Sequence, residues 1–71
     1  MAEITFWFID SNGLPKNGYT MVNIDDETAK NFYQSYKSFL EKGFPLGFEQ
    51  SFKRQVILTN FSHVFQVDIK W

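Results

Sequence analysis

The chain has 71 residues and no cysteine, so it lies near the lower size limit for a single hydrophobic core and has no disulfide to reinforce that core. Seven basic and eight acidic residues give a net charge of −1, which argues against a strong electrostatic grip on duplex nucleic acid or on an anionic membrane. Aromatic residues make up 20% of the chain, and each aromatic side chain buries about 150–250 Å² when it is enclosed. Either the core is simply rich in Phe, or part of the aromatic surface is left for a partner or a second copy.

The first predicted element is a strand over residues 3–10, because β-branched and aromatic residues dominate this segment. Apolar side chains occur on both of its faces, which is typical of a central strand. Residues 11–18 combine two Asn-Gly pairs with Pro15 and predict a hairpin loop. Residues 19–24 then predict a second strand that leads directly into a helix.

The inward face of this second strand is left open by the sequence. Val22 and Ile24 share one side of a regular strand, while Tyr19 and Met21 share the other. The register therefore depends on whether one face or both faces of the sheet are covered.

Residues 25–43 predict one amphipathic helix with a clear signal at each end. Asp25 is suited to accept hydrogen bonds from the free backbone N–H groups of the first turn, and Gly43 is suited to a left-handed C-cap. The apolar side chains at helical spacing are Ala29, Phe32, Tyr33, Tyr36, Phe39 and Leu40. This stripe predicts that the helix covers one face of a sheet.

The segment after the helix, residues 44–52, is too apolar for an ordinary solvated loop. Phe44, Leu46 and Phe48 alternate with Pro and Gly within it. Two interpretations stay open: a lid that closes one end of the core, with a short turn or strand in it, or an adhesive loop that presents Phe to a partner.

Two further strands are predicted over residues 53–59 and 64–71, connected by residues 60–63. The last of them has the most regular alternation in the chain, so one face is expected to be buried and the other to be wet. Its apolar side chains are Phe65, Val67, Ile69 and Trp71, and its polar side chains are Gln66, Asp68 and Lys70.

The order of these elements predicts an α+β fold, ββαββ, in a single domain that spans residues 1–71. We expect a mostly antiparallel four-stranded sheet with one amphipathic helix packed on one face. The first and last strands are expected to pair at the centre of the sheet.

Residue patterns that would indicate catalysis or cofactor binding are weak in this sequence. Ser62 and His63 are adjacent, and neighbouring side chains in a turn project apart, which disfavours a catalytic dyad. One His without Cys does not make a zinc site, and the acidic residues 25–27 are explained by helix capping. The four glycines do not form a phosphate-binding loop. We therefore expect a non-enzymatic protein with no cofactor and no bound metal.

The N-terminal segment suggests where the protein resides. It lacks the basic region of a secretory signal and reaches an acidic residue after a short apolar run, so the sequence predicts a cytoplasmic protein. No run approaches the length needed to cross a bilayer, and we expect no membrane partner.

The function predicted from these features is a small protein-binding module, homodimeric, that occludes a larger protein, as a phage- or plasmid-type inhibitor does. The aromatic surplus is the basis of this prediction. The residues expected to bind protein are Trp7, Ile9, Phe44, Leu46, Phe48 and Trp71. Homodimerisation is expected through Trp7 and Ile9, which point away from the helix in a regular first strand.

The alternative is a nucleic-acid-binding regulator that uses a weak basic patch. Its residues are Lys30, Lys37, Lys53 and Arg54. Acidic residues are interleaved with these cations, as on an ordinary solvated helix face, so nucleic acid is the less favoured partner.

Overall fold

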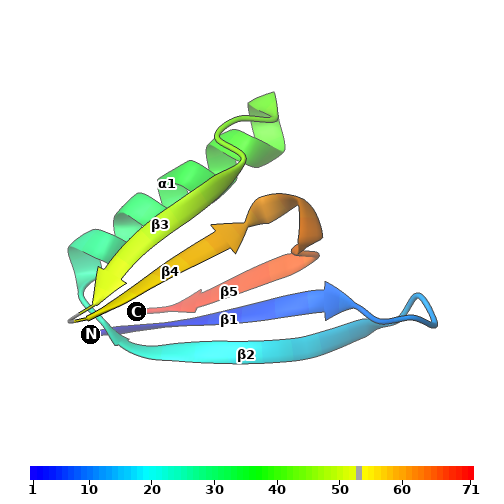
Figure 1. The fold of residues 1–71 in the computed structure, drawn as a ribbon, viewed down its shortest axis with the longest axis horizontal. Helices are drawn as coiled ribbons and strands as arrows, with labels where there is room; N and C mark the ends of the chain where they lie inside the picture. Colours follow the sequence, from blue (N-terminus) through cyan, green and yellow to red (C-terminus); the bar gives the residue numbers. More distant parts are fainter. Residues whose placement is uncertain (53) are drawn as a thin grey trace.

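The computed structural model describes residues 1–52 and 54–71 and shows an α+β fold of two layers. One layer is a three-stranded antiparallel sheet, and the other is formed by the helix and a separate two-stranded hairpin (Figure 1). The elements in chain order are β1 (Ala2–Ile9), β2 (Pro15–Ile24), α1 (Asp26–Lys42), β3 (Gly47–Phe52), β4 (Gln55–Asn60), the 3₁₀ turn η1 (Phe61–His63) and β5 (Gln66–Lys70).

The prediction of the α+β class is confirmed, but the prediction of one four-stranded sheet is wrong. The strands form a sheet of order β2-β1-β5 and a second sheet of order β3-β4. Residues 44–52, predicted as a lid or an adhesive loop that holds at most a short strand, contain β3. β3 and β4 pair with each other and form the separate hairpin. Of the two strands predicted after residue 52, only β5 therefore joins the main sheet.

β1 is central in the main sheet, as its two apolar faces predict, and it pairs with the last strand as expected. The last strand, β5, was also expected at the centre, but it lies at the edge, because β3 and β4 form a separate sheet. Its alternate residues Ala2, Ile4 and Phe6 are buried. These three side chains form the part of the core that the sheet contributes, and α1 and the hairpin cover them.

β2 begins earlier than predicted, at Pro15, because the turn before it is short. The Asp10 carboxylate accepts hydrogen bonds from the backbone N–H groups of Asn12 and Leu14, at 2.8 and 2.9 Å. Gly13 has a φ of 77°, a left-handed conformation that glycine adopts without steric cost. The tight turn thus takes only half of the predicted loop, and the rest is strand.

Two irregularities in the pairing of β1 with β2 resolve the open register of β2. One extra residue is inserted near Gly18 and another near Asn23, which has a φ of 58°. A bulge moves the following side chain to the other face of the sheet. Met21 and Ile24 are therefore both buried, although a regular strand would place them on opposite faces.

α1 confirms the helix prediction together with both of its caps. The backbone N–H of Thr28 donates to Asp25 Oδ2 at 3.0 Å, and Gly43, with a φ of 74°, donates its N–H to the Phe39 carbonyl at 2.8 Å. The apolar stripe is only partly used. Ala29 and Phe32 are buried, and others along the stripe remain half-buried or exposed.

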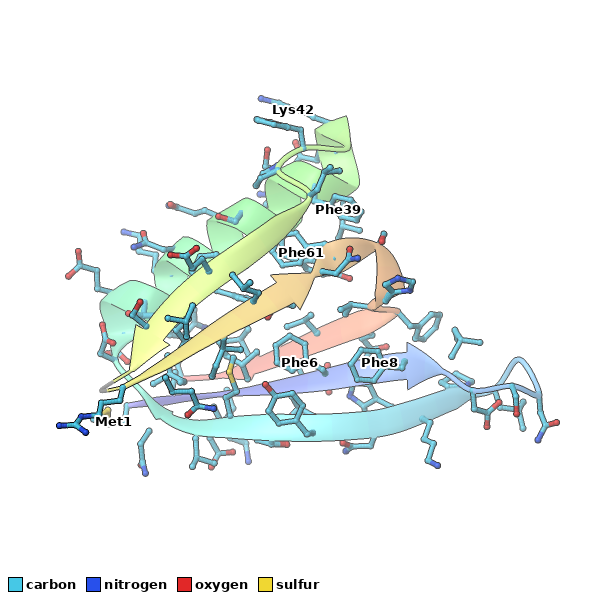
Figure 2. The ribbon with its side chains drawn as sticks, in the orientation of Figure 1. Met1, Phe6, Phe8, Phe39, Lys42 and Phe61 are labelled. Carbon is cyan, nitrogen blue, oxygen red and sulfur yellow. The ribbon has the colours of Figure 1, made fainter. Side chains whose placement is uncertain are left out.

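The core is largely an aromatic cluster that extends from Phe32 at its centre. The Phe32 ring lies 5.6 Å from Phe6, 5.1 Å from Phe48 and 5.6 Å from Phe61, each in an edge-to-face arrangement. Figure 2 shows Phe6 and Phe61 between the sheet and the helix. These contacts join β1, α1, β3 and η1, so the Phe-rich composition supplies much of the packing between the two layers.

Candidate protein-interaction surface

A large part of the apolar composition lies on the surface of the described residues. Thirteen large apolar side chains are exposed, against eight buried apolar residues in the core. An isolated exposed apolar residue is ordinary, whereas a contiguous group indicates a contact surface. The fold places these residues in different regions, which we describe in turn.

The β3–β4 hairpin and the residue just before it carry the most exposed group. Leu46, Val56 and Leu58 are 68%, 59% and 74% exposed, and we refer to these three side chains as the hairpin patch. Val56 and Leu58 are two residues apart on β4 and so share one face. Leu46 and Leu58 line the same shallow depression at the start of β3. Acidic Glu49 stands opposite Leu58 in the register and borders this patch.

The base of the hairpin patch is held by the core. The backbone N–H of Phe61 donates to the Leu46 carbonyl at 3.0 Å, and the Phe61 side chain is fully buried. The Asn60 side chain accepts a hydrogen bond from the Ser62 N–H at 3.0 Å and caps this turn. The patch is therefore presented on an anchored hairpin.

Of the predicted protein-binding residues in residues 44–52, two are exposed and one is not. Phe44 is exposed beside Leu46, and Ser38 Oγ donates a hydrogen bond to its carbonyl at 2.7 Å. Phe48 instead packs on Phe32 and is half-buried. Phe44 and Leu46 precede β3, which begins at Gly47, whereas Phe48 lies within β3 and its ring packs against Phe32 of α1.

Val56 and Leu58 were not among the residues predicted from sequence. The available signal was the alternation within residues 55–60, which sets Val56 and Leu58 on one face and Ile57 and Thr59 on the other. This signal does not say which face is buried. Packing of Ile57 against the core settles it.

The outer face of the main sheet, where Trp7 and Ile9 lie, is more polar than the sequence suggests. Trp7 is half-buried, and its Nε1 donates a hydrogen bond to Asp68 Oδ2 at 3.0 Å. The hydroxyl groups of Thr5 and Thr20 bond across β1 and β2 at 2.9 Å. Ile9 is 48% exposed at the end of β1. Trp7 thus belongs to a hydrogen-bonded polar face, separate from the hairpin patch.

A groove runs between α1 and the edge strand β5. We refer to it as the helix–edge groove, and its apolar lining is Tyr33, Tyr36, Leu40, Val67 and Ile69. Burial raises the pKa of the Tyr36 phenol above its usual value of 10.0. Trp71, another predicted protein-binding residue, is 60% exposed and adjoins this groove beside Tyr33, Val67 and Ile69.

The expected burial of one face of the last strand holds only in part. Val67 and Ile69 are half-buried, but Phe65 and Trp71 are exposed. β5 is shorter than predicted and ends at Lys70, so Phe65 and Trp71 lie outside the paired strand.

The predicted cations that the structure describes are divided between α1 and the β3–β4 turn. Lys30 and Lys37 are exposed on α1, and Lys37 Nζ lies 5.9 Å from the Tyr33 ring centroid. Arg54 is exposed between β3 and β4, and Lys53 lies outside the described residues. The cation of Lys37 therefore already has an aromatic neighbour.

The Ser62 and His63 side chains do not form a hydrogen-bonded pair in this structure. Ser62 Oγ donates to Asn60 Oδ1 at 2.7 Å, and His63 is exposed at the end of η1. Among residues 1–52 and 54–71 there is no group of three or more His, Cys, Asp or Glu side chains arranged to hold a metal ion.

The fold and its surface thus define a small α+β domain with exposed apolar surface at the hairpin and beside β5. Comparisons with protein-family models, with curated proteins and with solved structures find no match for this chain. In the part of the chain that the structure describes, no helix has the length and apolar character required to span a membrane.

Proposed function

We propose that this protein is a non-enzymatic protein-binding module that occludes a surface of a larger protein through the hairpin patch. An inhibitor or modulator of the phage or plasmid type fits this mode of action. The observation that carries the proposal is the exposure of Val56 and Leu58 on one face of β4, with exposed Leu46 beside Leu58 at the anchored base of the hairpin.

The physical reason is the free energy available from covering these side chains. Full burial of one large apolar side chain contributes roughly 1.5–3 kcal/mol relative to leaving it in water. Three such side chains close together resemble the apolar centre of a binding hot spot, which is surrounded by polar residues. Glu49 and Ser51, which stand directly opposite Leu58 and Val56 in the hairpin, would form part of that rim.

The composition of the patch and its rim defines the partner surface. It should offer an apolar depression for Leu58, because this side chain is the most exposed of the three. A basic group near that depression would complement Glu49 and contribute mainly to orientation and to the association rate. Occlusion requires no catalytic group, only a rigid contact surface.

The test compares two leucine variants of the same chemical type. Leu58→Lys introduces a charge into the hairpin patch, while Leu14→Lys introduces the same charge at another exposed leucine, in the β1–β2 turn. Proteins that co-purify with the parent from the native host are identified by mass spectrometry, and each is then purified and titrated by calorimetry. We expect Leu58→Lys to weaken binding of the true partner by about tenfold or more, and Leu14→Lys to leave it unchanged.

Two outcomes would overturn the proposal. One is that no protein binds the parent in the purified system. The other is that a purified partner binds Leu58→Lys as tightly as it binds the parent.

A further inference from the structure

β5 is an edge strand with a paired side and an open side. It pairs with β1, and within residues 1–52 and 54–71 no strand pairs with its other edge. An open edge presents unpaired backbone N–H and C=O groups, and it can accept a further strand. The helix–edge groove lies next to this edge, so an added strand would also cover apolar side chains.

The two faces of β5 differ in chemistry. Val67 and Ile69 stand opposite buried Phe6 and Ile4 of β1, so they belong to the face that points to α1. Asp68 alternates with them and belongs to the outer face.

The pattern of charges on this edge is self-complementary in one antiparallel register. When two copies of β5 pair about a two-fold axis at Ile69, Asp68 of each copy lies opposite Lys70 of the other. On the inner face, Ile69 meets its own copy and Val67 meets Trp71. Opposite charges and apolar pairs directly across an antiparallel ladder stabilise it.

Neighbouring registers lack this match. A two-fold axis at Asp68 places the two Asp68 carboxylates opposite each other, and an axis at Lys70 does the same with the two ammonium groups. Like charges directly opposite destabilise a strand pair. The edge therefore specifies its own alignment, because moving the two-fold axis by one residue, which slides the strands by two, replaces attraction with repulsion.

We propose that a second copy of this chain is the occupant of the β5 edge. The two sheets would join into one six-stranded antiparallel sheet, and the two α1 helices would lie on the same side of it. The exposed side chains Tyr33, Leu40 and Trp71 of each copy would be brought towards the interface. This two-fold contact is self-complementary and closes on itself, so it ends at a dimer.

The edge contact also differs from the dimer predicted from sequence. That prediction used Trp7 and Ile9, but Trp7 is hydrogen-bonded within the polar outer face. The β5 edge contact does not depend on the hairpin patch either, since no residue of the patch lies on β5. Leu58→Lys should therefore remain dimeric, which separates failure of this inference from failure of the proposed function.

The experiment is a charge swap measured by analytical ultracentrifugation at micromolar concentrations. The parent should sediment as a dimer. Lys70→Asp places acidic side chains opposite each other at both ends of the contact, and we expect a dimer dissociation constant about tenfold or more higher. Lys16→Asp makes the same change of charge on exposed β2, at the other edge of the sheet, and should leave the dimer intact.

The double variant Asp68→Lys/Lys70→Asp distinguishes an effect on dimerisation from damage to the fold. Lys70→Asp faces Glu3 within its own chain, and Asp68→Lys removes the acceptor of the Trp7 hydrogen bond. If these internal contacts were the cause, the double variant would be the most impaired of the three. If the edge pairs as proposed, the double variant restores opposite charges across the two-fold axis and regains the dimer.

Near-UV circular dichroism of each variant shows whether the aromatic core is retained, and Lys70→Asp should keep the parent spectrum. A parent that sediments as a monomer overturns the inference. So does a Lys70→Asp variant that dimerises as tightly as the parent, or a folded double variant that stays monomeric.

Discussion

Phe61 contacts both the aromatic core and the base of the hairpin patch. Its ring lies 5.6 Å from Phe32, 5.2 Å from Tyr36 and 5.6 Å from Phe39, and its backbone N–H holds the Leu46 carbonyl. The position of the hairpin patch is thus tied to the same contacts that fill the core.

Asp25 provides a prediction that depends on pH. Hydrogen bonding by the Thr28 side chain and then by its backbone N–H lowers the pKa of Asp25 from 3.8. A folded-state pKa below the unfolded value means that the carboxylate stabilises the fold above the unfolded pKa, and that this contribution is lost as pH falls through the folded pKa. Asp25→Asn keeps a capping side chain but has no carboxylate to titrate.

We expect the parent to have the higher melting temperature near neutral pH, and the difference from Asp25→Asn to shrink below pH 3.8. Melting curves of both proteins over a pH series provide the measurement. A difference that stays constant through this range would contradict the assignment of the cap to the charged carboxylate.

At the scale of elements, the hairpin depends on a close approach between its two strands. A Cβ atom added to Gly47 would fall on the backbone carbonyl oxygen of Thr59 in β4. Backbone atoms cannot move aside as a flexible side chain can, so the strands would have to separate at the base of the hairpin patch.

Gly47→Ala should therefore lower the free energy of unfolding by about 1–3 kcal/mol, the usual cost of overpacking. Urea denaturation measures it, with Ser51→Ala as the control, because Ser51 is exposed in the same strand. Equal stability of the two variants would show that the strands are not in close contact at Gly47.

Over the whole molecule, the charge distribution predicts weak binding to nucleic acid. The net charge is −1, and the predicted cations that the structure describes are divided between α1, which carries Lys30 and Lys37, and the β3–β4 turn, which carries Arg54. Affinity for duplex DNA depends on neutralising several phosphates at once. This protein offers no concentrated basic surface in the part that the structure describes.

We expect a dissociation constant for duplex DNA no tighter than the non-specific range, on the order of 10⁻⁴–10⁻⁶ M at physiological salt. Fluorescence anisotropy of a labelled duplex, repeated over a salt series, tests this. Nanomolar affinity with a steep dependence on salt would instead favour the nucleic-acid-binding alternative.

Local chemistry made several features readable from the sequence. Asp25 and Gly43 set the ends of α1 because capping involves groups only a few residues apart. β1 was recognisable as a central strand because both of its faces are apolar, and its pairing with the last strand was predicted correctly. The sequence also showed an excess of aromatic residues.

The tertiary structure alone decided how the strands are shared and which apolar residues remain exposed. Alternation in residues 55–60 defines two faces, but only the packing of Phe48 and Ile57 against the core determines that Leu58 faces water. The bulge near Asn23 in β2 brings Met21 and Ile24 to one side, which a regular period of two does not predict. Burial depends on neighbours that are distant in the chain, so the sequence by itself determined the helix and the central strand, whereas the fold decided where the exposed surface lies.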